Sequence, residues 1–86
     1  MLSLYLPTSS VRNKVLEIIR TYRNLSVLGT EIKIETLNKS GDVYMVRGEY
    51  SDRGFLQSYE QGTFEITLDA KDLKPIAVKI SPVKNR

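Results

Sequence analysis

The sequence contains neither cysteine nor histidine among its 86 residues. Without cysteine, the chain can form no disulfide framework, no thiolate metal site and no cysteine nucleophile. Without histidine, it lacks the commonest general base and the commonest zinc ligand. We therefore expect no metal centre and no cofactor, and carboxylates remain as the only plentiful candidates for catalysis.

Long apolar runs and secretory signals are missing as well. No stretch of the sequence approaches the roughly 18 apolar residues that a membrane-spanning helix needs. Residues 1–6 lack the charged start of a signal peptide. The expected location is therefore the cytoplasm, and no membrane partner is expected.

Motifs that bind phosphate or calcium are also missing. The five glycines are scattered, one to a turn or bulge, and form no phosphate-binding loop. Asp69 and Asp72 flank a turn, where such side chains usually stabilise the backbone. The glutamates of the predicted strands alternate with basic residues, as is typical of an exposed sheet face. We therefore predict no catalytic residue and favour a non-enzymatic protein.

What is present is the composition of a small globular domain. Hydrophobic residues make up 41% of the chain and charged residues 27%, which argues against disorder. At this length, residues 1–86 form one domain. Residues 9–25 carry four bases and one acid, whereas the rest of the chain carries nine of each. The whole net charge of +3 therefore lies on one segment.

That segment is predicted to be an amphipathic helix. Its apolar residues recur at spacings of three and four, which place them on one stripe of a helix. The stripe consists of Val11, Val15, Ile18, Ile19, Tyr22 and Leu25. Leu16 lies outside it among Arg12, Arg20 and Arg23, so it either extends the buried rim under the arginine stems or anchors a partner.

Residues 62–81 are predicted to form an antiparallel hairpin. Both arms alternate apolar and polar residues on either side of a polar turn. With Asp69 opposite Pro75, charge and hydrophobicity agree, because Glu65 then lies opposite Lys79. The inward pairs would be Leu68 with Ile76, Ile66 with Val78, and Phe64 with Ile80.

Two further strands are predicted at residues 30–38 and 43–50, joined by a turn at Gly41. Charge pairing favours the register in which Lys33 faces Glu49, Glu35 faces Arg47 and Ile32 faces Tyr50. Leu37 and Met45 would then meet on the outer face. Residues 51–61 are irregular and are either a loop or an extension of the strands past a bulge at Gly62.

This order of elements predicts an α+β fold in which one N-terminal helix packs on a curled antiparallel sheet of three to four strands. The run Gly62-Thr-Phe-Glu-Ile-Thr-Leu-Asp-Ala-Lys-Asp-Leu-Lys-Pro-Ile-Ala-Val resembles the end of PepSY-type modules, and the helix-on-sheet plan is similar to cystatin-like architecture. The resemblance implies a small regulatory or inhibitory binding domain. Inhibitory cystatins carry a Gln-x-Val-x-Gly loop. Residues 57–61 lack its valine and glycine, so protease inhibition is not expected.

The favoured function is a protein-interaction or regulatory binding module that also associates with itself. Exposed apolar clusters commonly mark contact surfaces. The candidate partner surface consists of Leu2, Leu4, Leu37, Met45, Phe55, Leu56 and Tyr59.

Two alternatives stay open. A nucleic-acid-binding protein would use the basic helix face, formed by Arg12, Leu16, Arg20 and Arg23. A small-molecule-binding or enzymatic domain would use a pocket inside the curled sheet.

Overall fold

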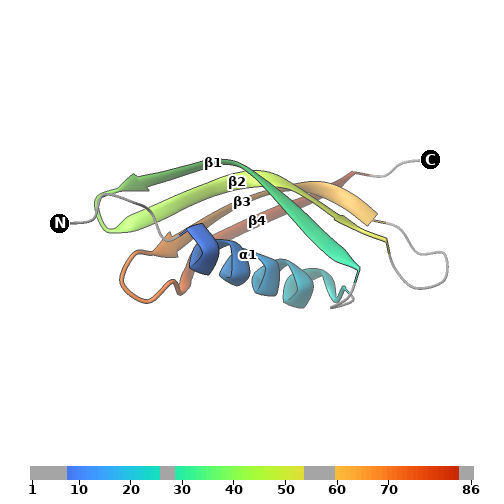
Figure 1. The fold of residues 1–86 in the computed structure, drawn as a ribbon, viewed down its shortest axis with the longest axis horizontal. Helices are drawn as coiled ribbons and strands as arrows, with labels where there is room; N and C mark the ends of the chain where they lie inside the picture. Colours follow the sequence, from blue (N-terminus) through green and yellow to red (C-terminus); the bar gives the residue numbers. More distant parts are fainter. Residues whose placement is uncertain (1–7, 26–28, 54–59, 84–86) are drawn as a thin grey trace.

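A computed structural model describes residues 8–25, 29–53 and 60–83 of the chain. It contains one helix and four strands in the order α1 (Thr8–Arg23), β1 (Thr30–Ser40), β2 (Val43–Asp52), β3 (Glu60–Asp69) and β4 (Pro75–Val83). The four strands form one antiparallel sheet in the order β1-β2-β3-β4, and α1 lies on one face of it (Figure 1). The predicted α+β fold, with one N-terminal helix on an antiparallel sheet, is thus confirmed; the sheet has four strands and is not closed into a barrel.

The helix ends because its backbone reverses at Asn24. Asn24 has a positive φ of 57°, a conformation that asparagine tolerates better than most residues. The following Leu25 amide donates to the carbonyl of Arg20 at 2.9 Å, which satisfies one of the carbonyls left free at a helix C-terminus. Arg20 and Arg23 occupy the last turn, where their charge complements the helix dipole.

The core lies between the helix and the centre of the sheet. Each strand contributes alternate residues to it, as the period-2 pattern requires. The buried hydrophobic residues are Val11, Val15, Ile18, Ile19, Ile32, Tyr44, Val46, Tyr50, Phe64, Ile66 and Leu68. The predicted pairs Ile66 with Val78, Phe64 with Ile80, and Ile32 with Tyr50 are confirmed.

Two glycines of the sheet lie opposite aromatic residues of the core. Gly48 pairs with Phe64, and Gly62 pairs with Tyr50. A Cβ at Gly48 would lie 2.9 Å from the Phe64 ring, and one at Gly62 would lie 2.9 Å from the Tyr50 ring. The main-chain carbonyls of Lys33 and Ser81 would lie closer still, so backbone and ring together leave no room for a side chain at either glycine. Gly62 pairs regularly with its neighbours on both sides, so the predicted bulge there is wrong.

The bulge of the first hairpin lies in β1 instead. The register shifts between Ile34 and Thr36, so Thr36 rather than Glu35 faces Arg47. The extra residue reverses the faces of the strand beyond it. Leu37 consequently turns inward and packs against the core, and the prediction that it meets Met45 on the outer face is wrong.

A second bulge displaces Ile76. Asp69 donates its amide to the carbonyl of Lys74 at 2.8 Å, and Leu68 then lies opposite Pro75. Ile76 has no partner in this register and is 57% exposed. The predicted pair of Leu68 with Ile76 is therefore wrong, because the turn closes one residue earlier than expected.

The side chains of the turn itself behave as predicted. The carboxylate of Asp69 accepts from the Lys71 amide at 2.7 Å, and that of Asp72 accepts from the Lys74 amide at 3.0 Å. Both aspartates thus stabilise the turn backbone, which is the usual role of aspartate at such positions.

Candidate partner-binding surface

The most exposed apolar part of the sheet is β4. Ile76 and Val83 are 57% and 50% exposed, and Val78 and Ile80 are only half-buried although they face the helix side. A helix with its side chains is about 10–12 Å wide, whereas four strands spaced about 4.8 Å apart span more. The backbone of α1 comes nearest to β1, and Val78 and Ile80 of β4 pack only at the rim of the core. Within the described residues, the β4 edge of the core is therefore covered less fully.

β4 is also an edge strand, because β3 is its only neighbour in the described sheet. Every second residue of an antiparallel strand directs its N–H and C=O away from the neighbouring strand. Prolines lie at both ends, at Pro75 and Pro82, and the bulge at Ile76 interrupts the pairing with β3. The regular, proline-free stretch of this edge is therefore Ala77–Ser81.

The single charged side chain of this edge is Lys79. It lies opposite Glu65 as predicted, but the Glu65 carboxylate pairs with Arg47 at 3.1 Å. Among the described residues no carboxylate lies within ion-pair distance of Lys79. The predicted register is confirmed at this position, beyond the bulge. The carboxylate of Glu65, however, forms its ion pair with Arg47 of β2 instead of with Lys79.

The opposite edge, β1, is less available to a partner. Arg12 donates from its guanidinium to the main-chain carbonyl of Ile32 at 3.3 Å, so the helix covers part of this strand. The bulge at Glu35 breaks its regularity, and bulges and charges are common ways of protecting an edge. The two edges of the sheet are therefore unequal, and within the described residues β4 is the open one.

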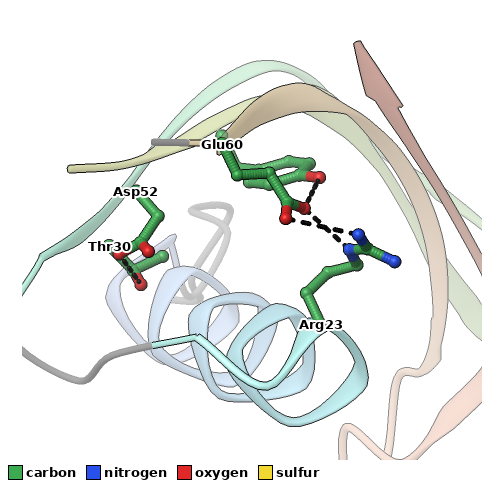
Figure 2. Close-up of polar contacts among 5 residues, drawn as sticks. Arg23, Thr30, Asp52 and Glu60 are labelled. Atoms are coloured by element: carbon green, nitrogen blue, oxygen red, sulfur yellow. Dashed lines mark hydrogen bonds and ion pairs between the residues drawn. The ribbon is translucent and has the colours of Figure 1, made fainter. Parts of the chain in front are cut away.

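A polar clamp fastens the end of the helix to β3. We use the term polar clamp for Arg23, Tyr50 and Glu60. Arg23 donates from Nε and Nη2 to the two carboxylate oxygens of Glu60 at 2.7 and 3.2 Å. The Tyr50 hydroxyl donates to the same carboxylate at 2.6 Å. Figure 2 shows Arg23 reaching from the helix toward Glu60 at the start of β3.

Each contact in the clamp shifts the proton affinity of its partners. The hydrogen bond from Arg23 lowers the pKa of Glu60, with a smaller contribution from Tyr50 and against the opposing effect of burial. Burial, and then the contact with Glu60, raises the pKa of Tyr50. The same carboxylate raises the pKa of Arg23. The clamp therefore holds Glu60 charged and Tyr50 protonated, which suits attachment rather than proton transfer.

A second polar pair lies near the clamp. Thr30 and Asp52 are 7% and 5% exposed, and the Thr30 hydroxyl donates to Asp52 Oδ1 at 3.2 Å (Figure 2). Across residues 8–25, 29–53 and 60–83, no buried side-chain nitrogen or oxygen lacks a hydrogen-bond partner. The buried polar groups are thus used within the fold.

Two arginines of the predicted nucleic-acid face form contacts within the fold. Arg12 points to the backbone of β1 and Arg23 to Glu60. Arg20 is half-buried, and Leu16 is half-buried against the core. Leu16 therefore extends the buried rim, the first of its two predicted roles. The four residues lie on one side of the helix, but they do not form a row of free cations.

Tyr22 departs from the predicted apolar stripe, since it is 60% exposed. Sheets twist, so the side of a straight helix that faces the sheet changes along its length. At the last turn the side chain that reaches the sheet is Arg23 rather than Tyr22.

Of the predicted partner surface, only Met45 is both described and exposed, at 46%. Leu37 belongs to the rim of the core, as noted above. The remaining residues, Leu2, Leu4, Phe55, Leu56 and Tyr59, lie outside the described residues. Sequence reasoning missed the exposure of β4, because its alternation of apolar and polar residues is that of a covered strand.

Two hollows of the described surface lie on the helix-free face of the sheet. One of 360 Å³ has Glu31, Lys33 and Glu49 at its rim, and one of 320 Å³ lies beside it around Arg47 and Glu65. The helix side is filled by the core instead. The predicted pocket inside the curled sheet therefore gains no support from the core packing on the helix side and stays a prediction.

Two further properties bear on the class of protein. No described helix is long and apolar enough to cross a membrane. Within the part of the chain that the structure describes, no three acidic residues gather in a way that would hold a metal ion.

Comparisons with known proteins add no relative. No protein-family model matches this sequence, and no curated protein or solved structure is measurably similar to it. The resemblance to PepSY-type and cystatin-like modules therefore stays a prediction, and the function has to be argued from the surface itself.

Proposed function

We propose that this protein is a small non-enzymatic interaction module that binds a protein partner along β4. The observation that supports it best is the exposure of apolar side chains on β4, an edge strand of the sheet. Ile76 and Val83 are at least half exposed there, and Val78 and Ile80 are partly buried. Val83 lies on the helix-free face, opposite Gln61. Exposed apolar side chains at a sheet edge are typical of contact sites.

The polar side chains support the same conclusion, because several of them bind one another within the fold. The charged groups of the clamp bind one another, and the buried Asp52 binds Thr30. Chemistry on a substrate needs carboxylates or cations that are directed into a cleft. The rim of the larger hollow instead mixes Glu31, Lys33 and Glu49 on an exposed face, where charges of both signs are ordinary surface.

Site-specific crosslinking in cells that express the protein tests this proposal. A photoreactive amino acid placed at Ile76 should give one discrete adduct, because this side chain projects from the proposed contact surface. The same group placed at Lys39, an exposed residue of β1, serves as the matched control and should give none. Mass spectrometry of the adduct identifies the partner, which must then bind the purified protein.

Self-association stays a prediction, and the same crosslinking experiment tests it. An adduct of two copies of this chain would identify the partner as the protein itself. Equal labelling from Ile76 and Lys39, or no adduct from Ile76, would contradict an interaction site on β4.

A further inference from the structure

Resting on the proposed function, we infer that the partner binds by strand addition: an extended segment pairs with Ala77–Ser81 of β4 and places an acidic side chain opposite Lys79. The partner is another protein rather than a second copy of this chain. Both parts of the inference follow from the geometry of the open edge.

The backbone of this edge offers a template for a further strand. Residues 77–81 pair regularly with β3 on one side, so their outward N–H and C=O groups are held at the spacing of a strand. Peptides that add to a sheet edge gain affinity from such groups and specificity from alternate side chains. Pro82 carries no amide hydrogen, and the bulge at Ile76 ends the regular ladder. The added segment is therefore short.

The two faces of β4 define the side chains that fit. Val78 and Ile80 face the helix side and are partly buried against the rim of the core, so apolar residues of the partner would extend the core there. Lys79 faces the opposite side, and among the described residues it forms no ion pair, because the Glu65 carboxylate pairs with Arg47. A partner segment with one acidic residue between two apolar residues matches both faces.

The same residues disfavour pairing between two copies of β4. A symmetric antiparallel pair that uses all of Ala77–Ser81 must be centred on Lys79, so the two lysines would lie opposite one another. Like charges in directly opposed positions are destabilising. Symmetric registers shifted to either side bring the bulged Ile76 or Pro82 into the ladder. This edge is therefore suited to a foreign acidic strand.

A peptide with the sequence of residues 63–67, Thr-Phe-Glu-Ile-Thr, is a suitable probe. In the fold these residues pair with β4 from the other side, with Glu65 opposite Lys79 and Phe64 and Ile66 opposite Ile80 and Val78. A free copy should add to the open edge of the full-length protein and shift the NMR signals of the Ala77–Ser81 amides. Shifts confined to the helix-free face or to the helix would overturn the inference.

A charge exchange tests the role of Lys79. The Lys79→Glu variant should bind the peptide about fivefold more weakly, and a peptide with lysine in place of glutamate should restore its affinity. Lys33→Glu is the matched control, since Lys33 is an exposed lysine on β1, and it should leave the affinity unchanged. Wild type and Lys79→Glu, each measured with the glutamate peptide and with the lysine peptide, give four affinities. If all four were equal, the charge requirement would be overturned.

Backbone pairing is tested separately by N-methylation. Two peptides methylated on alternate amides should differ, because only one set of amides faces β4 in an added strand. Binding of both methylated peptides, or of neither, would overturn strand addition. Such a result together with a discrete crosslink at Ile76 would leave the interaction module intact, so failures of the two proposals are distinguishable.

Measurements on the protein without peptide test whether either of two other segments occupies the edge. A dimer in sedimentation experiments with protected Ala77–Ser81 amides would mean that a second copy occupies the edge. A shift of these amides in the Leu4→Asp variant, without peptide, would mean that residues 1–7 of the same chain do so. Either result would overturn the proposal of a foreign partner.

Discussion

Two isoleucines that share the same alternating sequence pattern contribute very differently to the stability of the fold. Ile66 is 1% exposed in the centre of β3, whereas Ile76 is 57% exposed on the bulge of β4. Removing a buried side chain leaves a cavity as well as losing the transfer free energy of the deleted atoms. An exposed side chain leaves no cavity, so truncation there has little effect.

We therefore expect Ile66→Ala to lower the free energy of unfolding by about 2–5 kcal/mol, and Ile76→Ala to change it by less than about 0.5 kcal/mol. Urea unfolding of both variants measures this, and the chemical change is identical in the two. Comparable losses would show that Ile76 is packed in solution and would remove the main support for a contact surface on β4.

The sequence contains a signal for one of the two bulges but not for the other. Ile32 and Ile34 alternate, but Leu37 follows at an odd spacing. An extra residue in β1 explains how all three face the core. In β4, by contrast, Ile76, Val78 and Ile80 alternate without interruption. The exposure of Ile76 follows from the turn, in which Leu73 adopts a φ of 62° and Lys74 closes on Asp69.

At the scale of elements, the polar clamp determines how the helix end is attached to the sheet. Glu60 is charged in the fold, and its hydrogen bond from Arg23 lowers its pKa below the ordinary value of 4.5. A carboxyl whose pKa is lower in the folded state stabilises the fold above its unfolded pKa, and this contribution is lost as the pH falls through the folded pKa. The clamp therefore weakens in acid.

The Glu60→Gln variant tests this dependence. At pH 7 we expect it to be less stable than wild type by about 1 kcal/mol, since the pair is partly exposed to solvent. On acidification to below the pKa of Glu60 the difference should shrink, because wild type then loses the same charge. Urea unfolding at a series of pH values between 7 and 2 measures both effects.

The Glu65→Gln variant is the control for this experiment. It makes the same chemical change in a more exposed pair, in which the side chains of Arg47 and Glu65 are 64% and 51% accessible. Its stability should follow that of wild type closely at every pH. A constant difference between Glu60→Gln and wild type from pH 7 to acid would show that the charge of Glu60 does not stabilise the fold.

The helix and the strands were predictable from the sequence, whereas the contacts between the helix and the sheet were less predictable. Periodicity identified the helix and the strands, and charge pairing placed Lys33 opposite Glu49. The clamp was not predicted, because Arg23 and Glu60 are 37 residues apart and neither lies in a pattern that links them. Such contacts depend on the twist of the sheet under the helix, which local sequence does not encode.

At the scale of the whole molecule, one narrow helix covers a wider sheet. The fold measures 48 × 20 × 19 Å, and its helix is packed toward β1. Composition alone indicates a domain large enough for one core, but not which edge of the sheet stays uncovered. The exposure of β4 is therefore a property of the assembled fold, and so is the partner surface that we place on it.

The net charge of +3 raises the question of nucleic-acid binding at this same scale. Each phosphate contact made by a basic side chain contributes about −0.9 to the slope of log affinity against log salt for duplex DNA. In this fold Arg23 is neutralised by Glu60, and Lys14 lies 3.8 Å from Glu17. Few cations of the helix are thus left to contact phosphates.

We therefore expect no measurable binding of the protein to duplex DNA at about 150 mM salt, where non-specific binding depends on several phosphate contacts. Fluorescence anisotropy with a labelled duplex and labelled single strands over a salt series measures this. The Glu60→Gln variant provides a sharp comparison, since it frees Arg23 and should strengthen any binding seen at low salt. Tight binding by wild type with a slope steeper than about −3, abolished in an Arg12→Ala, Arg20→Ala double variant, would instead favour the helix as a nucleic-acid face.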